Sequence, residues 1–188
     1  MERILIGELG KHVGETVSIS GWIDVRRDQG KMVFFDFRDR SGVTQGVVLP
    51  ASGAMEIAKE CKQEFAVRVS GMVNKRPEKN VVAGKQNGDI ELEVYGIEIL
   101  GKAEALPFDL SAEGFPFELT TQLDHRALML RHPRLRAIFK VQNTIIDSFR
   151  EFMKQNEFFE FQAPSITPAT AEGGAEVFKI DYFAPKAY

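Results

Sequence analysis

The feature that most constrains the fold is a series of short segments in which apolar and polar residues alternate. In residues 17–25, the apolar side chains are predicted to face one way and the polar side chains the other. The apolar set is Val17, Ile19, Ile23 and Val25. Turns rich in Gly, Asp and Ser separate further segments of this kind. They span residues 32–38, 43–49, 65–73 and 89–94, the last continuing through 97–100.

One helix is expected between the third and fourth of these strands. Residues 52–64 contain good helix formers with apolar residues at helical spacing, and Ser52 is a candidate N-cap. The order of three strands, one helix and two strands is that of an OB-fold, a five-stranded Greek-key barrel. Small SH3-like barrels also have five strands, but they usually lack a helix after the third. We therefore predict an OB-fold barrel over residues 1–101.

A second domain is predicted after a hinge. Residues 102–122 lack periodicity but contain prolines and three phenylalanines, which is typical of an ordered connection. Residues 133–155 predict a long helix, because proline suits the first turn and apolar residues recur at spacings of three and four. Residues 158–162 then predict a strand that Pro164 closes. The expected class is α+β, with domains at residues 1–101, 102–122 and 123–188.

Composition excludes several classes of protein. A hydrophobic fraction of 44% and a charged fraction of 27% are those of a globular protein with a core, and the net charge of −3 restricts any RNA contact to a local surface. The single cysteine, Cys61, excludes a disulfide framework and a CxxC zinc site, and we expect it to be buried. The three histidines lack metal-ligand spacing, so no metal site is predicted. Without a long apolar run or a signal peptide, we expect a cytoplasmic protein that does not contact a membrane.

The second strand offers a candidate binding surface. If Val33, Phe35 and Phe37 fill the barrel, Phe34 stands outside it, near Arg38. Further basic residues lie close in the sequence, namely Arg26, Arg27 and Lys31. An exposed ring flanked by cations is the composition of a single-strand nucleic-acid site, where the ring stacks on a base and the cations contact phosphates.

Two polar residues on neighbouring strands fit the same surface. Gln45 offers both donors and an acceptor to a base edge, and Glu91 can accept a hydrogen bond from an exocyclic amine. The pattern alone leaves an alternative open, in which Phe34 packs under a loop and the charged residues form an ordinary solvated face.

Four segments resemble the class II aminoacyl-tRNA synthetases for aspartate, asparagine and lysine. Residues 21–45 resemble the anticodon-binding domain of that family, and residues 123–131 resemble the segment that opens its catalytic domain. Residues 149–164 are similar to class II motif 1, and residues 167–178 resemble the flipping loop that closes over the amino acid. The Glu-Gly-Gly form of this loop, together with the later residues 181–183, favours the aspartyl members. The fold implied is an OB-fold barrel followed by the start of an antiparallel-sheet catalytic domain.

The resemblance implies roles for four residues in binding the tRNA anticodon. Phe34 would stack on the central anticodon base, and Arg27 would contact the anticodon region. Gln45 and Glu91 would form hydrogen bonds with anticodon bases.

Further implications concern the full-length enzyme. Glu172 would approach the ammonium group of bound aspartate, and Pro164 would lie in a homodimer interface. ATP and Mg²⁺ would activate the aspartate before its transfer to tRNA. Motifs 2 and 3 of the family do not occur in these 188 residues. We therefore expect the chain to be an inactive part of a longer enzyme, with no catalytic residue and no cofactor bound on its own.

Three functional interpretations remain open at this stage. The first is an aspartate–tRNA ligase, to which this chain contributes anticodon recognition and part of the dimer interface. The second is a non-catalytic OB-fold fragment that binds tRNA or single-stranded RNA. The third is an asparagine–tRNA ligase, which shares both domains.

Overall fold

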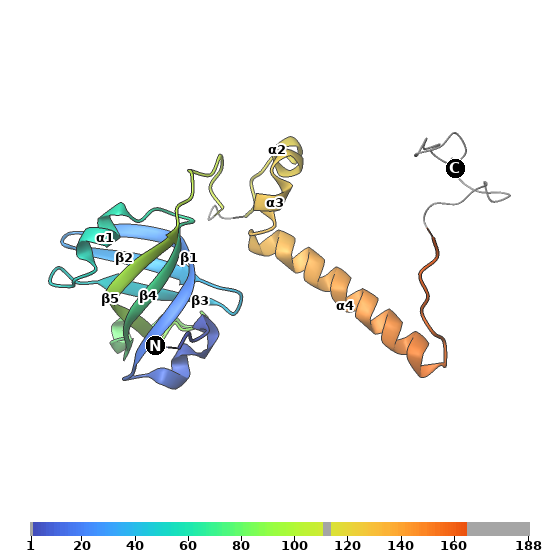
Figure 1. Cartoon of the computed structure of the whole chain (residues 1–188), viewed down its shortest axis with the longest axis horizontal. Coiled ribbons are helices and arrows are strands. Elements are labelled where there is room, and N and C mark those ends of the chain that lie inside the picture. The colour runs from blue at the N-terminus through green and yellow to red at the C-terminus, as the bar shows by residue number, and fades with distance from the viewer. Residues whose placement is uncertain (1, 111–113, 165–188) are drawn as a thin grey trace. The chain divides into compact units, whose positions relative to one another are not determined.

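A computed structural model of the chain describes residues 2–110 and 114–164 (Figure 1). Contacts divide the chain into two compact units, Met1–Leu119 and Thr120–Tyr188. Among the described residues, the first unit is built mainly from strands and the second from helices, and the border between them falls inside the predicted hinge.

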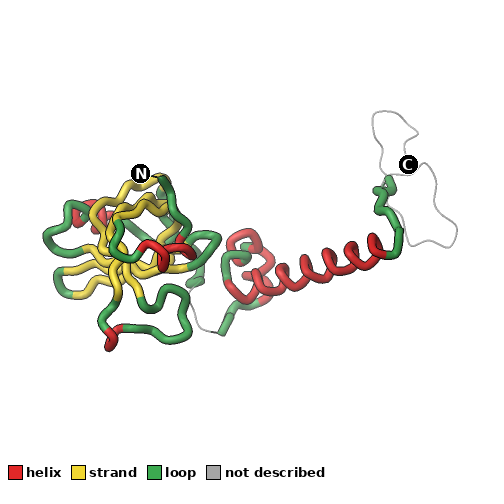
Figure 2. The backbone as a smooth tube through the Cα atoms, turned by 90° about the horizontal axis from the view of Figure 1, so that it is seen from below, coloured by secondary structure: helices red, strands yellow, loops and turns green. Residues whose placement is uncertain are grey.

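The first unit contains a closed five-stranded barrel, as the alternation predicts (Figures 1 and 2). The strands are β1 (Thr16–Gln29), β2 (Met32–Arg38), β3 (Val43–Val48), β4 (Ala66–Lys75) and β5 (Ile90–Gly101). They pair in the order β1-β2-β3-β5-β4, and only the β3–β5 pair is parallel. Helix α1 (Met55–Glu60) connects β3 to β4, which completes the predicted OB-fold order. Two 3₁₀ helices, η1 (Ile6–His12) and η2 (Glu78–Asn80), were not predicted.

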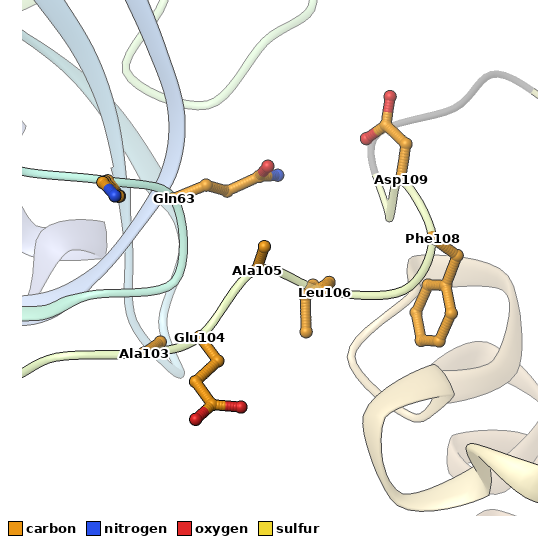
Figure 3. Close-up of a pocket in the computed structure, with 8 residues that line it drawn as sticks. Gln63, Ala103, Glu104, Ala105, Leu106, Phe108 and Asp109 are labelled. Carbon is orange, nitrogen blue, oxygen red and sulfur yellow. The ribbon is translucent and has the colours of Figure 1, made fainter.

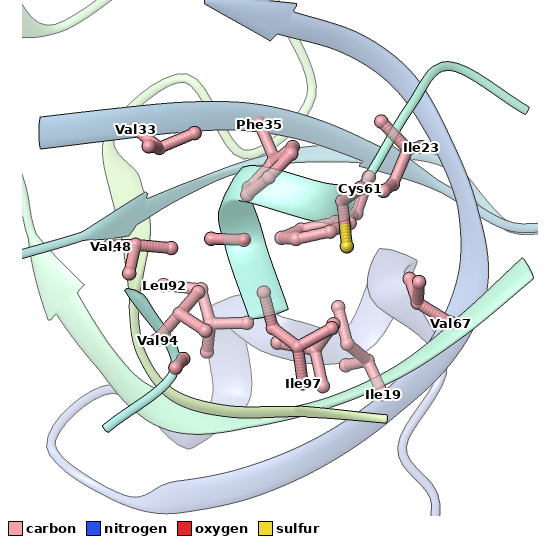
Figure 4. Close-up of a cluster of buried hydrophobic side chains, with 14 of the residues drawn as sticks. Ile19, Ile23, Val33, Phe35, Val48, Cys61, Val67, Leu92, Val94 and Ile97 are labelled. Atoms are coloured by element: carbon pink, nitrogen blue, oxygen red, sulfur yellow. The ribbon is translucent and has the colours of Figure 1, made fainter. Parts of the chain in front are cut away.

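The barrel core is filled by the inward side chains of the strands and by α1 (Figure 4). On β2, Val33, Phe35 and Phe37 are at most 5% exposed, which confirms the predicted inward face. Cys61, which follows α1, is fully buried, as expected of a small apolar residue. Burial raises the pKa of its thiol, although the nearby Arg26 acts in the opposite direction.

Two local predictions were wrong. Val25 does not share the inward face of β1, because the pairing of β1 with β2 shifts at Asp24. An extra residue in a strand reverses the alternation beyond it. Helix α1 is also shorter than the predicted residues 52–64, and Ser52 is not its N-cap. The Ser52 hydroxyl donates to the Val94 carbonyl (2.7 Å) and accepts from the Ala54 amide (3.2 Å), ahead of the first helical residue. The helix starts at Met55.

The described part of the second unit contains two short helices and one long helix. They are α2 (Leu119–Asp124), which begins at the border, α3 (Arg126–Met129) and α4 (Pro133–Gln155). The bounds of α4 confirm the prediction, with Pro133 in the first turn and His132 as N-cap. The imidazole Nδ1 of His132 accepts a hydrogen bond from the Arg134 amide at 3.2 Å. None of the described helices is long and apolar enough to cross a membrane.

The predicted strand at residues 158–162 is not formed. This segment and Pro164 are exposed and carry no strand assignment, although Arg150 and Glu160 form an ion pair at 2.9 Å. A strand needs a partner to accept its hydrogen bonds, and no strand of the described second unit is available. Local sequence could therefore indicate the segment's propensity but not its pairing.

Candidate nucleic-acid interface

The predicted anticodon residues lie on one outer surface of the barrel. We call this surface the outer face, and its central members are Arg27, Phe34, Asp36, Gln45, Glu91 and Glu93. Arg27 is directly opposite Phe34 across β1 and β2, and Gln45 is directly opposite Asp36 across β2 and β3. Residues opposite each other in an antiparallel pair share a face of the sheet. The register therefore brings Arg27, Phe34 and Gln45 together.

Glu91 extends this surface onto β5. Strands β3 and β5 are parallel, with Gly46 opposite Leu92 and Val47 opposite Glu93. Gly46 and Leu92 are buried, so Glu91 and Glu93 point outward on either side of Leu92. The structure thus places all four predicted residues on the same face.

Phe34 lies outside the core but is not fully exposed. Its neighbours along β2, Val33 and Phe35, point inward, whereas Phe34 is of intermediate exposure. Across the strands it is flanked by Arg27 on one side and by Val47 on the other. The side chain of Phe34 is therefore partly covered and partly open to solvent.

Arg27, the cation directly opposite Phe34 in the strand register, is held in place by Asp36. Two guanidinium nitrogens of Arg27 donate to the two carboxylate oxygens of Asp36, at 2.7 and 3.2 Å. The Arg27 side chain remains 41% exposed. A bidentate pair of this kind fixes the orientation of the guanidinium without removing it from solvent.

Two of the other cations that the sequence suggested have structural roles. Arg26 donates to the backbone carbonyls of Lys59 (3.1 Å) and Cys61 (2.8 Å) at the end of α1. Arg38 is paired with Asp24 at 2.8 Å and with Glu64. These partners come from distant positions that the alternation of β2 could not reveal.

The charge on Arg38 is secured by its two carboxylate partners. Burial on its own would lower the pKa of Arg38, but hydrogen bonds and charges from Glu64 and Asp24 raise it above its ordinary value. The guanidinium therefore remains protonated beside two carboxylates, whose combined charge exceeds its own. It adds little positive charge to the outer face.

The sequence interpretation missed two polar residues of the outer face. Glu93 on β5 lies opposite Val47 on β3, and Val47 in turn lies opposite Phe34 on β2. The carboxylate of Glu93 accepts a hydrogen bond from the side-chain amide of Asn74 at 2.9 Å. The alternation of β5 could have identified Glu93, since it places Glu91 and Glu93 on one side. Asn74 could not be found in this way, because its position follows from the pairing of β4 with β5.

Two predicted positions remain, Glu172 and Pro164. Glu172 lies outside the described residues, and Pro164 is exposed beyond α4. The described residues include no cluster of His, Cys, Asp or Glu that could hold a metal ion. A separate pocket of about 480 Å³ is lined by Lys62, Gln63 and residues of segment 103–109 (Figure 3). None of the predicted anticodon-binding residues lines it.

The arrangement suits recognition of unpaired bases. An aromatic ring provides a stacking surface, and amide and carboxylate groups beside it can form hydrogen bonds with base edges. A closed OB-fold barrel with such a surface defines a nucleic-acid-binding module.

The comparisons with known proteins agree with this class. A family model described as "OB-fold nucleic acid binding domain" matches residues 17–100, and one described as "tRNA synthetases class II (D, K and N)" matches residues 118–188. The chain belongs to this class II aminoacyl-tRNA synthetase family, and it consists of the OB-fold barrel followed by the start of the catalytic domain.

The relatives are named as ligases for two different amino acids. The chain is 39% identical to an asparagine–tRNA ligase of Desulforamulus reducens, over 100% of this chain and 42% of the relative. It is 36% identical to an aspartate–tRNA(Asp/Asn) ligase of Archaeoglobus fulgidus, over 93% of this chain and 40% of the relative. It is also similar to a solved asparaginyl-tRNA synthetase of Pyrococcus horikoshii in complex with asparaginyl-adenylate, with a TM-score of 0.81 and 29% identity over 97% of this chain and 41% of that one. The chain thus spans about two fifths of the length of these relatives, and the mixed names leave the amino acid unresolved.

Proposed function

We propose that the outer face recognises the anticodon loop of a tRNA for an aspartate–tRNA ligase that acts in the cytoplasm. The observation that carries this proposal is the register of the barrel. It sets Arg27 opposite Phe34 and Gln45 opposite Asp36 on one surface. The match of residues 118–188 to the class II synthetase family supports a tRNA-ligase activity of the full-length enzyme.

Each residue has a distinct role in this proposal. Phe34 stacks on the central anticodon base, while Gln45 and Glu91 read base edges through hydrogen bonds. Arg27 contacts a phosphate of the loop, in place of part of its pairing with Asp36. Most of the recognition comes from stacking and base edges, because the other nearby arginines are already neutralised.

Other parts of the proposal belong to the full-length enzyme. Glu172 approaches the ammonium group of aspartate, and Pro164 lies in a homodimer interface. ATP and Mg²⁺ supply the activation of the carboxylate. We assign no step of this chemistry to the described residues.

An asparagine–tRNA ligase is the second candidate. The 39% identity with the Desulforamulus reducens asparagine–tRNA ligase over the entire chain favours it. Aminoacylation by the full-length protein with each amino acid in turn separates the two ligases. Failure with both, while tRNA still binds, would indicate a binding protein without ligase activity.

Binding of the 188-residue chain to tRNA tests the proposed interface. The replacement Phe34→Ala is expected to weaken binding of the aspartate tRNA about 5- to 150-fold, through loss of base stacking. Phe34→Tyr retains a ring and is expected to bind almost as well as the unmodified chain. Fluorescence anisotropy of labelled tRNA measures both.

Two controls accompany this measurement. Thermal unfolding of Phe34→Ala should be nearly unchanged, because the ring lies outside the core. A phenylalanine tRNA should bind more weakly than the aspartate tRNA. Equal binding of both tRNAs, or full-strength binding by Phe34→Ala, would refute anticodon recognition by this face.

A further inference from the structure

Trp22 occupies a second position on the barrel surface that contains Phe34. It is the only tryptophan in the chain and is 40% exposed on β1. The register places Trp22 opposite Arg38 and Arg38 opposite Val43, which is also 40% exposed. Arg38 and Phe34 point to the same side of β2. The row of side chains formed by Trp22, Arg38 and Val43 therefore continues the outer face. Four residues along a strand separate the two rows by ~13 Å.

The indole of Trp22 is supported from one side by Arg38. The guanidinium carbon of Arg38 lies 5.7 Å from the centre of the ring, in a cation–π contact. Arg38 is itself held by Asp24 at 2.8 Å and by Glu64, and its side chain is only 16% exposed. The indole is therefore backed by a fixed group, so a ligand that stacks on its free surface has little side-chain motion to restrict.

The charges around Trp22 restrict the chemistry of its ligand. Asp24 and Glu64 neutralise Arg38, and the side chain of Asp24 is 35% exposed. A phosphate would be repelled by the exposed carboxylate, whereas an uncharged aromatic ring would cover the indole at no electrostatic cost. The exposed indole and the neighbouring Asp24 carboxylate therefore favour contact with a nucleobase over contact with the phosphate backbone.

We propose that Trp22 is a second stacking platform, which binds an unpaired nucleobase of the same RNA loop whose central base stacks on Phe34. This inference rests on the proposed anticodon-binding function and extends it to another subsite. It also accounts for the exposure of a large aromatic side chain on the strand that carries Arg27.

Because Trp22 is the only tryptophan, indole fluorescence reports on this subsite alone. The full chain is titrated with an anticodon stem–loop RNA of the aspartate tRNA, while tryptophan emission and its quenching by acrylamide are recorded. Stacking of a base is expected to quench the emission by at least a third and to reduce the acrylamide quenching constant at least twofold. The variant Phe34→Ala should show the same change once the RNA is saturating.

Binding constants of three variants provide the second measurement. Trp22→Ala is expected to weaken binding about 5- to 150-fold, whereas Trp22→Phe, which keeps a ring, should stay within about threefold of the unmodified chain. Tyr95→Ala is the matched control, because Tyr95 is 41% exposed but lies at an irregularity between β4 and β5, outside the pairing with β3. It should bind normally.

The outcomes separate this inference from the proposed function. If Phe34→Ala weakens binding but Trp22 emission and acrylamide quenching do not respond to RNA, the second platform is refuted and the anticodon role of Phe34 stands. If neither Phe34→Ala nor Trp22→Ala weakens binding, both are refuted. Should Trp22→Ala fail to fold, the emission and quenching of the unmodified chain decide the matter.

Discussion

At the scale of single residues, Asp39 joins the N-terminal 3₁₀ helix to the turn between β2 and β3. Its side chain is 1% exposed and accepts hydrogen bonds from the amides of Ile6 (3.0 Å), Ser41 (2.7 Å) and Gly42 (3.2 Å). Burial alone would raise the pKa of Asp39, but these bonds and one from the Ser41 hydroxyl together lower it below its ordinary value. The folded state thus favours the ionised carboxylate.

The sign of this shift predicts a dependence of stability on pH. A carboxyl group whose pKa is lower in the folded state stabilises the fold fully above its unfolded pKa of about 3.9. That contribution is lost as pH falls through the lower folded pKa. We expect Asp39→Asn to lower the free energy of unfolding at pH 7 by about 1–3 kcal/mol. Between pH 7 and pH 3, the free energy of unfolding of Asp39→Asn should fall less than that of the unmodified chain.

Urea unfolding across this pH range measures the effect. Asp28→Asn serves as the control, because the Asp28 side chain is 61% exposed, and it should change stability by less than about 0.5 kcal/mol. If the free energy of unfolding of Asp39→Asn and of the unmodified chain fell equally with pH, Asp39 would make no contribution to the acid sensitivity.

The residues of the candidate site differ in how far the sequence could predict them. The outward position of Phe34 follows from alternation within β2 alone, which is a local property. The engagement of Arg26 with the end of α1 and of Arg38 with Glu64 depends on contacts 26–35 residues away in the sequence. Such contacts arise from the closure of the barrel, so the sequence could not show that Arg26 and Arg38 are already engaged by other groups.

At the scale of elements, the parallel pairing of β3 with β5 depends on the absence of a side chain at Gly46. A Cβ atom at this position would lie 2.5 Å from the Phe37 ring and 3.1 Å from Val94. Phe37 and Val94 are both fully buried, so neither can move away freely. The glycine lets β3 approach the core closely enough to close the barrel and to align Gln45 beside β5.

The expected consequence is that Gly46→Ala destabilises the barrel by about 1–3 kcal/mol through overpacking, although alanine has less backbone freedom to lose than glycine. Thermal or urea unfolding measures this change. Gly10→Ala is the matched control, because no atom lies within 4 Å of the added Cβ. Equal stability of Gly46→Ala and the unmodified chain would mean that the core around Phe37 adapts without strain.

Helix α4 and the segment after it show which elements local sequence can predict. Pro133, the apolar periodicity and Asn156 lie within the helix or at its ends, so the bounds of α4 could be read directly from the sequence. The segment at residues 158–162 has strand character, but strand formation requires hydrogen bonds to another chain segment. Helical hydrogen bonds are internal to the element, which is why α4 forms where the strand does not.

At the scale of the whole molecule, α4 carries an apolar stripe that the described residues leave exposed. Its members are between 54% and 63% exposed: Ile138, Val141, Ile145, Phe149 and Phe152. Exposed apolar surfaces of this extent mark interaction sites or aggregation-prone regions. The C-terminal part of the stripe lies in residues 149–164, which resemble motif 1, so we propose that the stripe mediates association between copies of the chain.

We therefore predict that the chain self-associates through α4. The double replacement of Ile145 and Phe149 by Asp should raise the dissociation constant at least tenfold, because charged groups lose their hydration when an apolar surface closes over them. Sedimentation velocity over a range of concentrations measures this. Lys140→Gln with Lys154→Gln lowers the net charge by the same two units on the opposite side of the helix, and this control should associate normally.

The barrel provides an internal reference for the same experiment. Because α4 and the barrel belong to different compact units, the unfolding of the barrel should not change in the Asp variant. The prediction would be wrong if the chain remained monomeric at every concentration and its second unit unfolded cooperatively. That result would show that other residues of the same chain cover the stripe. Association through α4 would instead place two barrels in one particle. Binding of tRNA should then saturate at one tRNA per chain, both in the dimer and in the monomeric Asp variant.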